Sequence, residues 1–92
     1  SLLKNLYMSY NGWDNYATFR VANDILNNIK FSEDGVTIDE LKEIVRSVVL
    51  SNLSGHFLAT DYINLFLNTV DWSELAEVYN TDILTAKLNL QT

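Results

Sequence analysis

Apolar residues recur every three or four positions along much of the chain, and the clearest such run lies between residues 37 and 53. This spacing places the apolar side chains on one face of a helix and the polar ones on the other. The predicted buried stripe consists of Ile38, Leu41, Ile44, Val45, Val48, Val49 and Leu53. Thr37 followed by Glu40 is a capping-box pattern, so the helix should begin at residue 37. Leu50 falls on the polar side and is therefore a candidate binding residue.

An earlier helix is predicted over about 15–28 by the same spacing. Its apolar arc contains Phe19, Val21, Ala22, Ile25, Leu26 and Ile29. Asp14 or Asn15 can cap its first turn, because both side chains accept hydrogen bonds from exposed backbone N–H groups. Thr18 lies within the apolar arc, so its hydroxyl needs a hydrogen-bond partner there. Arg20 and Asp24, four residues apart, should form a surface ion pair.

Two further helices are predicted over about 59–69 and 71–80. The apolar residues of the first are Tyr62, Ile63, Leu65, Phe66 and Leu67, followed by Val70. They cover about half of the helix circumference, so this helix should lie in the centre of a bundle or against a second chain. Asp71 followed by Glu74 repeats the cap pattern at the start of the second helix. The fold predicted is therefore all-α, a small bundle of four helices forming one domain over residues 1–92.

The two ends of the chain follow no single pattern. Leu84, Ala86, Leu88 and Leu90 alternate with polar residues, a period of two that is typical of a half-buried strand. A short helix from Asp82 to Leu90 fits residues 81–92 equally well. A strand there would need a partner, either the N-terminal arm Ser1–Tyr10 or a second protomer. Within that arm, Met8 is an alternative translation start, which would make residues 1–7 a leader.

Composition and charge narrow the function. Apolar residues are 48% and charged residues 20% of the 92 residues, as expected for one globular domain. Without cysteine and with one histidine, a disulfide framework and a thiolate or histidine metal cluster are excluded, and we predict neither a metal nor a cofactor.

Twelve acidic against 6 basic residues give a formal net charge of −6, which disfavours nucleic acid and anionic membranes as partners. The longest apolar run is far shorter than a membrane span, and we expect a cytoplasmic protein.

Acid–base chemistry has one weak candidate, the pairing of His56 with Asp61. The spacing of these two residues, across a predicted helix boundary, does not bring them into contact. Ser54 or Thr60 could act as a nucleophile, but neither is surrounded by the glycine pattern of a nucleophile elbow. We therefore predict that the protein is not an enzyme.

The acidic residues fall into two groups along the chain. They are Glu33, Asp34, Asp39, Glu40 and Glu43, and then Asp71, Glu74, Glu77 and Asp82. An acidic surface can imitate DNA and occupy the basic cleft of a nuclease or restriction enzyme. Many of these acids, however, lie at helix starts, where they stabilise the helix locally. Such inhibition is the alternative hypothesis, with Glu40, Glu43, Glu74 and Glu77 as its candidate binding residues.

Residues 11–21 combine a turn, two large aromatic side chains and a helix start. Trp13 and Tyr16 are candidate binding residues, because tryptophan and tyrosine dominate binding hot spots. They can equally fold over the start of the helix and bury their rings, with Asn15 as the cap. The principal functional hypothesis is a non-enzymatic protein that binds another protein, in its simplest form a second copy of itself.

Two segments also have a recognisable pattern. Gly12-Trp13-x-Asn15-Tyr16-x-Thr18-Phe19-x-Val21 and Val70-Asp71-Trp72-Ser73-Glu74-Leu75-Ala76-Glu77 stand in this order. They resemble the G-W-x-N-Y-x-T-W-x-V opening and the V-N/D-W-x-E-I-A-E closing segment of a family of small uncharacterised proteins from phages, plasmids and cyanobacteria. The chain departs from this family at Phe19, where tryptophan is usual, and in its more apolar middle. The resemblance implies a small helical fold and a phage-like origin, and it implies no activity. Because both segments coincide with predicted helix starts, we interpret them as fixed points of the fold.

Overall fold

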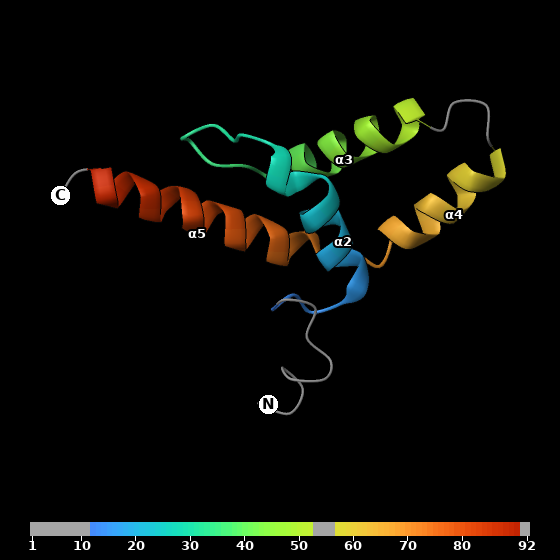
Figure 1. Cartoon of the computed structure of the whole chain (residues 1–92), viewed down its shortest axis with the longest axis horizontal. Helices are drawn as coiled ribbons and strands as arrows, with labels where there is room; N and C mark the ends of the chain where they lie inside the picture. Colours follow the sequence, from blue (N-terminus) through green and yellow to red (C-terminus); the bar gives the residue numbers. More distant parts are fainter. Residues whose placement is uncertain (1–11, 53–56, 91–92) are drawn as a thin grey trace.

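A computed structural model describes residues 12–52 and 57–90 of the chain. These residues form four α-helices and no strand, which confirms the predicted all-α class (Figure 1). The helices are α2 (Tyr16–Asp24), α3 (Ile38–Asn52), α4 (Phe57–Leu67) and α5 (Trp72–Leu90), and a 3-10 turn, η1 (Leu26–Asn28), follows α2. Of these helices, none is long and apolar enough to cross a membrane.

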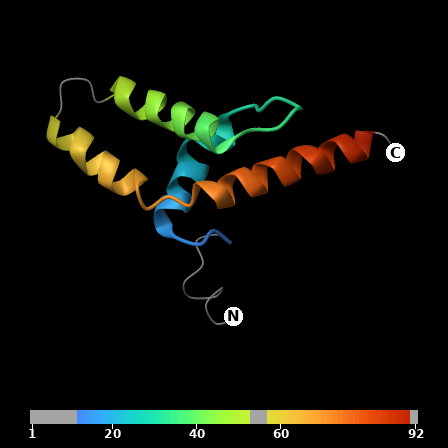
Figure 2. The same ribbon diagram turned by 180° about the vertical axis from the view of Figure 1, so that it is seen from behind.

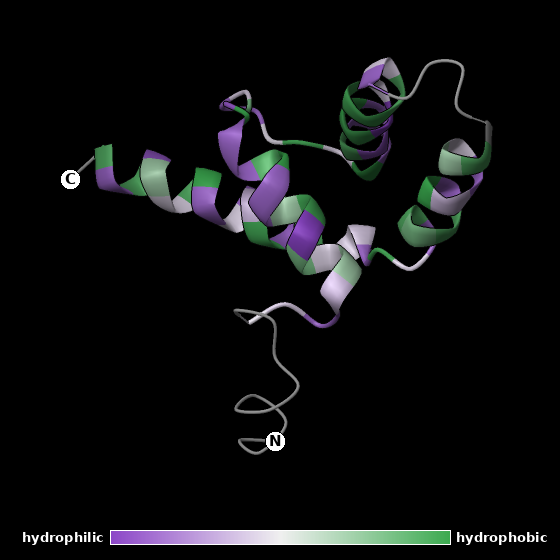
Figure 3. Cartoon of the chain, turned by 45° about the vertical axis from the view of Figure 1, so that its right-hand side comes forward, coloured by the Kyte–Doolittle hydropathy of each residue, from purple (hydrophilic) through white to green (hydrophobic). Residues whose placement is uncertain are grey.

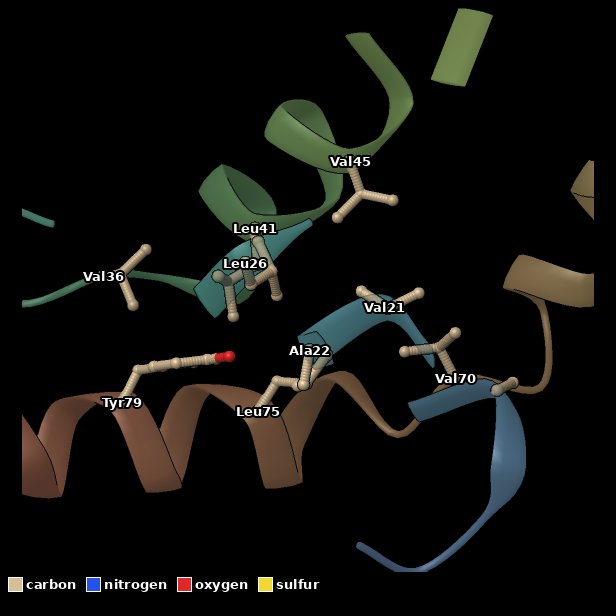
Figure 4. Close-up of a cluster of buried hydrophobic side chains, with 10 residues drawn as sticks. Val21, Ala22, Leu26, Val36, Leu41, Val45, Val70, Leu75 and Tyr79 are labelled. Atoms are coloured by element: carbon tan, nitrogen blue, oxygen red, sulfur yellow. The ribbon is translucent and has the colours of Figure 1, made fainter. Parts of the chain in front are cut away.

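The core forms where α2 lies between α3 and α5 (Figures 1 and 2). Leu26, Leu41 and Leu75, the largest fully buried side chains, come from three different elements. Figure 4 shows the side chains of α3 and α5 pointing toward α2 from its two sides, with Tyr79 lying below η1. The two longer helices also pack directly against each other, and α2 and η1 contribute Ala17, Val21, Ala22 and Leu26 to the shared core.

The start of α3 confirms the predicted capping box. The backbone N–H of Glu40 donates to Thr37 Oγ1 at 3.1 Å, and the N–H of Thr37 donates to Glu40 Oε1 at 3.2 Å. Within the predicted stripe, Leu41 and Val45 are buried, and Ile44 and Val49 pack against the core. Val48 is exposed instead, because the last turns of α3 extend beyond α2 and α5 (Figure 1). Leu53 lies outside the described residues.

Helix boundaries differ from the prediction in three helices. Helix α4 runs over Phe57–Leu67 rather than 59–69. The first helix ends at Asp24 rather than 28, where the Ile25 N–H donates to Val21 O and the chain tightens into η1. The last helix continues from Trp72 to Leu90 rather than ending at 80. The strand alternative for residues 81–92 is therefore wrong over 81–90. No proline or glycine interrupts this segment, and extending an existing helix is easier than forming a new element.

The turn before α3 is hydrogen-bonded to α5. Asn80 on α5 pairs with both backbone groups of Val36: the Val36 N–H donates to Asn80 Oδ1 at 2.7 Å, and Asn80 Nδ2 donates to Val36 O at 2.9 Å. Gly35 adopts a φ of 99° beside this contact. Farther along α5, Lys87 Nζ donates to Glu33 O at 3.3 Å. These contacts support the extended last helix as far as its fifth turn.

Helix α4 does not lie in the centre of the bundle. It extends away from the core and is joined to α5 by a short turn (Figures 1 and 2). None of the side chains described in residues 58–67 is fully buried. The central position predicted as one alternative for this helix is therefore wrong. The N-terminal arm Ser1–Tyr10, including Met8, lies outside the described residues.

Candidate functional site

The two recognisable segments meet at the start of α2. Asn15 is the N-cap of this helix, as predicted, and its Oδ1 accepts from the Thr18 N–H at 2.8 Å. The same side chain donates from Nδ2 to Thr69 O at 2.9 Å, in the turn after α4. One asparagine therefore caps α2 and also binds the backbone just before the second segment. Its two amide ends have different partners, which a carboxylate could not satisfy because it only accepts.

Thr18 connects the two segments directly. Its side chain is fully buried, at 0% exposure, although it carries a hydroxyl. Thr18 Oγ1 donates to Asn15 Oδ1 at 2.9 Å and accepts from the Asp71 N–H at 2.8 Å. The partner that the sequence requires for this hydroxyl is thus supplied by the N-terminus of α5. Both hydrogen-bonding capacities of the buried group are used, so its burial carries no unsatisfied polar atom.

The cap of α5 is shared between helices. The Glu74 N–H donates to Asp71 Oδ1 at 3.0 Å, as the predicted cap requires. In a simple capping box the Glu74 carboxylate would accept from the Asp71 N–H. Here that N–H donates to Thr18, and Glu74 Oε1 instead accepts from the Asp14 N–H at 3.1 Å. We call these five residues, Asp14, Asn15, Thr18, Asp71 and Glu74, the motif junction.

Three carboxylates gather in the motif junction. Asp14, Asp71 and Glu74 each place one oxygen within 4.8 Å of those of the other two. Burial raises the pKa of the Glu74 carboxyl, the N–H of Asp14 opposes this, and the carboxylates of Asp14, Asp71 and Glu77 raise the pKa further. Carboxylate oxygens are also the ligands of hard cations. Two of the three acids already accept backbone N–H groups, so helix capping accounts for the cluster and we assign no metal to it.

The two candidate aromatic residues have different surroundings. Trp13 is half-buried and packs against the core, with its ring centroid 6.3 Å from that of Tyr79. Tyr16 is exposed and does not cover the end of the helix. Its hydroxyl accepts from Arg20 Nη1 at 2.7 Å, and Arg20 also forms the predicted ion pair with Asp24 at 2.6 Å. Trp13 therefore belongs to the fold, whereas Tyr16 contributes to the surface.

The candidate acidic residues are divided between two helices. Glu40 and Glu43 are exposed on α3, where Glu40 accepts the capping N–H of Thr37. On α5, Glu77 is exposed, whereas Glu74 is half-buried in the motif junction. Glu74 therefore has the structural role that the cap pattern indicated, although its carboxylate accepts from the Asp14 N–H rather than from that of Asp71. Leu50 is exposed near the end of α3, as predicted.

The largest exposed apolar side chains of α4 form one stripe. Leu58, Tyr62 and Leu65 are 69%, 65% and 63% exposed, and their spacing of four and three residues places them on one line along the helix. Figure 3 shows hydrophobic residues along α4, a helix that extends away from the core. On the side of α4 that faces α2 and α3, a groove of about 400 Å³ is lined by Val21, Ile25, Val49, Ile63, Phe66 and Leu67, with Arg20, Asp24 and Tyr62 at the same opening. We call Leu58, Tyr62 and Leu65 the α4 stripe.

A pair of basic residues lies beside the C-terminal end of α4. Lys42 and Arg46, four residues apart on α3, line a smaller cavity of about 200 Å³ together with Leu67, Asn68 and Trp72. Within residues 12–52 and 57–90, neither makes an ion pair. The sequence analysis missed this pair. Its signal was the four-residue spacing of two of only six basic residues in an acidic chain.

The residues considered for acid–base chemistry are not assembled by the described part of the chain. His56 and Ser54 lie outside it. Asp61 is exposed on α4, and Thr60 is half-buried on the same helix.

Comparison with known proteins finds no match to the chain, whether among protein-family models, curated proteins or solved structures. The resemblance to the phage and plasmid family therefore stays a prediction that rests on the two segments alone. The geometry adds that hydrogen bonds of Thr18 and Asp14 join the first segment to the second, and that Asn15 binds the backbone of Thr69 just before it.

Proposed function

We propose that the protein is a non-enzymatic interaction protein that binds another protein through the α4 stripe. The single observation that carries this proposal is the exposure of Leu58, Tyr62 and Leu65, each above 60%. As in the sequence analysis, we place this activity in the cytoplasm. The phage-like origin implied by the two segments is compatible with it and is not needed for it.

The physical argument rests on the cost of leaving this stripe in water. Fully burying a leucine side chain is worth roughly 1.5–3 kcal/mol relative to leaving it exposed. Single exposed leucines are common and need no explanation, but a contiguous apolar stripe marks a contact surface. Tyr62 adds a large ring with a polar tip, a combination enriched in the energetically dominant residues of interfaces. The fold therefore buries the polar side chain of Thr18 and leaves these apolar side chains available to a partner.

Site-specific photocrosslinking tests this proposal. A benzophenone amino acid placed at Leu58 should give covalent adducts with a partner in cells that make the full chain. The same group placed at Thr85, an exposed residue of α5, is the matched control and should give none. Mass spectrometry of the adducts identifies the partner. Absence of adducts from Leu58, or equal adducts from both positions, would contradict the proposal.

A second candidate, an acidic inhibitor of a DNA-binding enzyme, is supported by the exposure of five acids within residues 33–43. They are Glu33, Asp34, Asp39, Glu40 and Glu43. Under this alternative, Glu43→Lys combined with Glu77→Lys should abolish inhibition of a nuclease and leave the fold intact. Glu74 is unsuitable for this test because its reversal would disrupt the motif junction. Inhibition unaffected by the two reversals would eliminate the alternative.

A further inference from the structure

Asp61, Leu65 and Asn68 lie along one side of α4. Their spacing of four and three residues places them on a single line, which meets the α4 stripe at Leu65. Asp61 is the only charged residue between residues 57 and 67, and it is exposed. Asn68, two turns later, lines the cavity that also contains Lys42 and Arg46. This side of α4 therefore has an acid near the middle of the helix and two bases beside its end.

Such an arrangement is complementary to itself when two copies are turned by a half rotation. In a two-fold contact, residue i of one copy meets residue j of the other, and residue j meets residue i. If two α4 helices lie antiparallel and cross near residue 64, Asp61 of each copy lies opposite the C-terminal end of the other α4. The bases Lys42 and Arg46 stand at that end. Tyr62 and Leu65 of the two copies then face each other between these charged positions.

The distribution of charge also favours α4 over the other helices as the contact between two copies. Two chains with a net charge of −6 repel each other, so a contact between copies needs a surface with few acids. Helix α4 carries one acid, whereas α3 and α5 carry three each. Lys42 and Arg46, without ion-pair partners in the described residues, supply the positive charge that such a contact requires.

We infer that the partner bound by the α4 stripe is a second copy of this chain, in a two-fold dimer that pairs Asp61 of each copy with Lys42 and Arg46 of the other. This inference rests on the proposed function, because it names the partner of the same surface. It makes the interface isologous, so that the assembly closes at two copies.

A charge-swap series measured by sedimentation equilibrium tests the inference. Asp61→Arg should weaken dimerisation roughly tenfold or more, because it replaces attraction by repulsion at both symmetric positions. Arg46→Asp should do the same, and the two substitutions together should restore most of the affinity. Asp39→Arg is the matched control, since it changes the net charge equally from an exposed position on α3. This control should leave dimerisation unchanged or strengthen it slightly by reducing the overall repulsion.

The outcomes separate this inference from the proposed function. Leu65→Ser should give a folded monomer, because Leu65 is exposed and makes no contribution to the core. A wild-type chain that stays monomeric up to millimolar concentration would overturn the dimer, as would a combined Asp61→Arg and Arg46→Asp variant no better than either alone. If crosslinking at Leu58 then still captures a different protein, the proposed function stands and only the second-copy inference fails. If crosslinking captures nothing, both fail.

Discussion

The hydroxyl of Thr18 is a single polar group that determines how two helices meet. It is buried among apolar residues of α2 and accepts the first free N–H of α5, while it donates to the Asn15 cap. A buried N–H without an acceptor loses its hydrogen bond to water and gains nothing in exchange. The position of α5 relative to α2 is therefore specified by a polar contact as well as by the packing of Leu75 and Ala22.

Thr18→Val should lower the free energy of unfolding by about 1–3 kcal/mol, because valine has the same shape and leaves the Asp71 N–H buried without an acceptor. Thr18→Ser keeps the hydroxyl and removes one methyl group, so it should cost only about 1 kcal/mol. Urea denaturation measures both. The order of the two variants is the test, since a valine variant as stable as the serine variant would show that packing alone positions α5.

The raised pKa of Glu74 leads us to predict that the stability of the folded protein depends on pH. Its pKa is raised in the folded protein above the ordinary value of 4.5, so the folded state holds this proton more tightly than the unfolded state. The contribution of Glu74 to stability is therefore present at low pH and is lost as the pH rises from the ordinary value through the raised one. Glu74→Gln removes this loss and keeps an oxygen that accepts from the Asp14 N–H.

The stability of Glu74→Gln relative to the unmodified chain should accordingly increase as the pH rises from the ordinary pKa of 4.5 through the raised pKa of Glu74. Glu43→Gln serves as the control, because it removes the same charge from an exposed position on α3. Denaturation at several pH values gives both differences. If the stability difference of Glu74→Gln does not change with pH, or changes as the control does, the pKa of Glu74 is not raised by its surroundings in the motif junction.

At the scale of elements, capping explains which parts of the fold could be predicted. Thr37 with Glu40 and Asn15 with Thr18 are local pairs, so their hydrogen bonds follow from sequence spacing and the helix starts were predicted correctly. The hydrogen bond from the Asp14 N–H to the Glu74 carboxylate joins residues sixty positions apart, so no local sequence pattern predicts it. The alternation in residues 84–90 also favoured a strand that does not form. These residues are exposed on the last turns of α5, where apolar side chains are tolerated on several sides, so a period of two carries little information there.

The turn that joins η1 to α3 offers a test of such a non-local contact. A methyl group on Gly35, whose φ is 99°, would lie 2.8 Å from Asn80 Oδ1, which is held by the Val36 N–H. Gly12 has a similar φ of 90°, but a methyl group there meets no atom of the described residues within 4 Å.

Gly12→Ala should therefore cost only the backbone strain of a positive φ, about 1–2 kcal/mol. Gly35→Ala should cost about 1 kcal/mol more, because it also displaces the Asn80 side chain from its two hydrogen bonds. Thermal denaturation compares the two variants. Equal losses would mean that the Asn80 contact with the turn adds nothing to stability.

At the scale of the whole molecule, burial differs between the core and α4. The core lies where α2 meets α3 and α5, and the motif junction closes one end of it. Helix α4 contributes Phe66 and Leu67 to that core but leaves Leu58, Tyr62 and Leu65 in water. Local stability follows local burial, so α4 should open more easily than the rest until a partner covers it.

Amide hydrogen exchange on the full chain, followed at micromolar and at submillimolar concentration, tests this division most directly. The junction amides of Thr18, Asp71 and Glu74 should be among the slowest to exchange and should not depend on concentration, because they are hydrogen-bonded within one chain. The amides of α4 should exchange quickly in the dilute sample and slow down as concentration rises. The account is contradicted if the α4 amides are already as protected as the junction in the dilute sample, or if concentration leaves them unchanged.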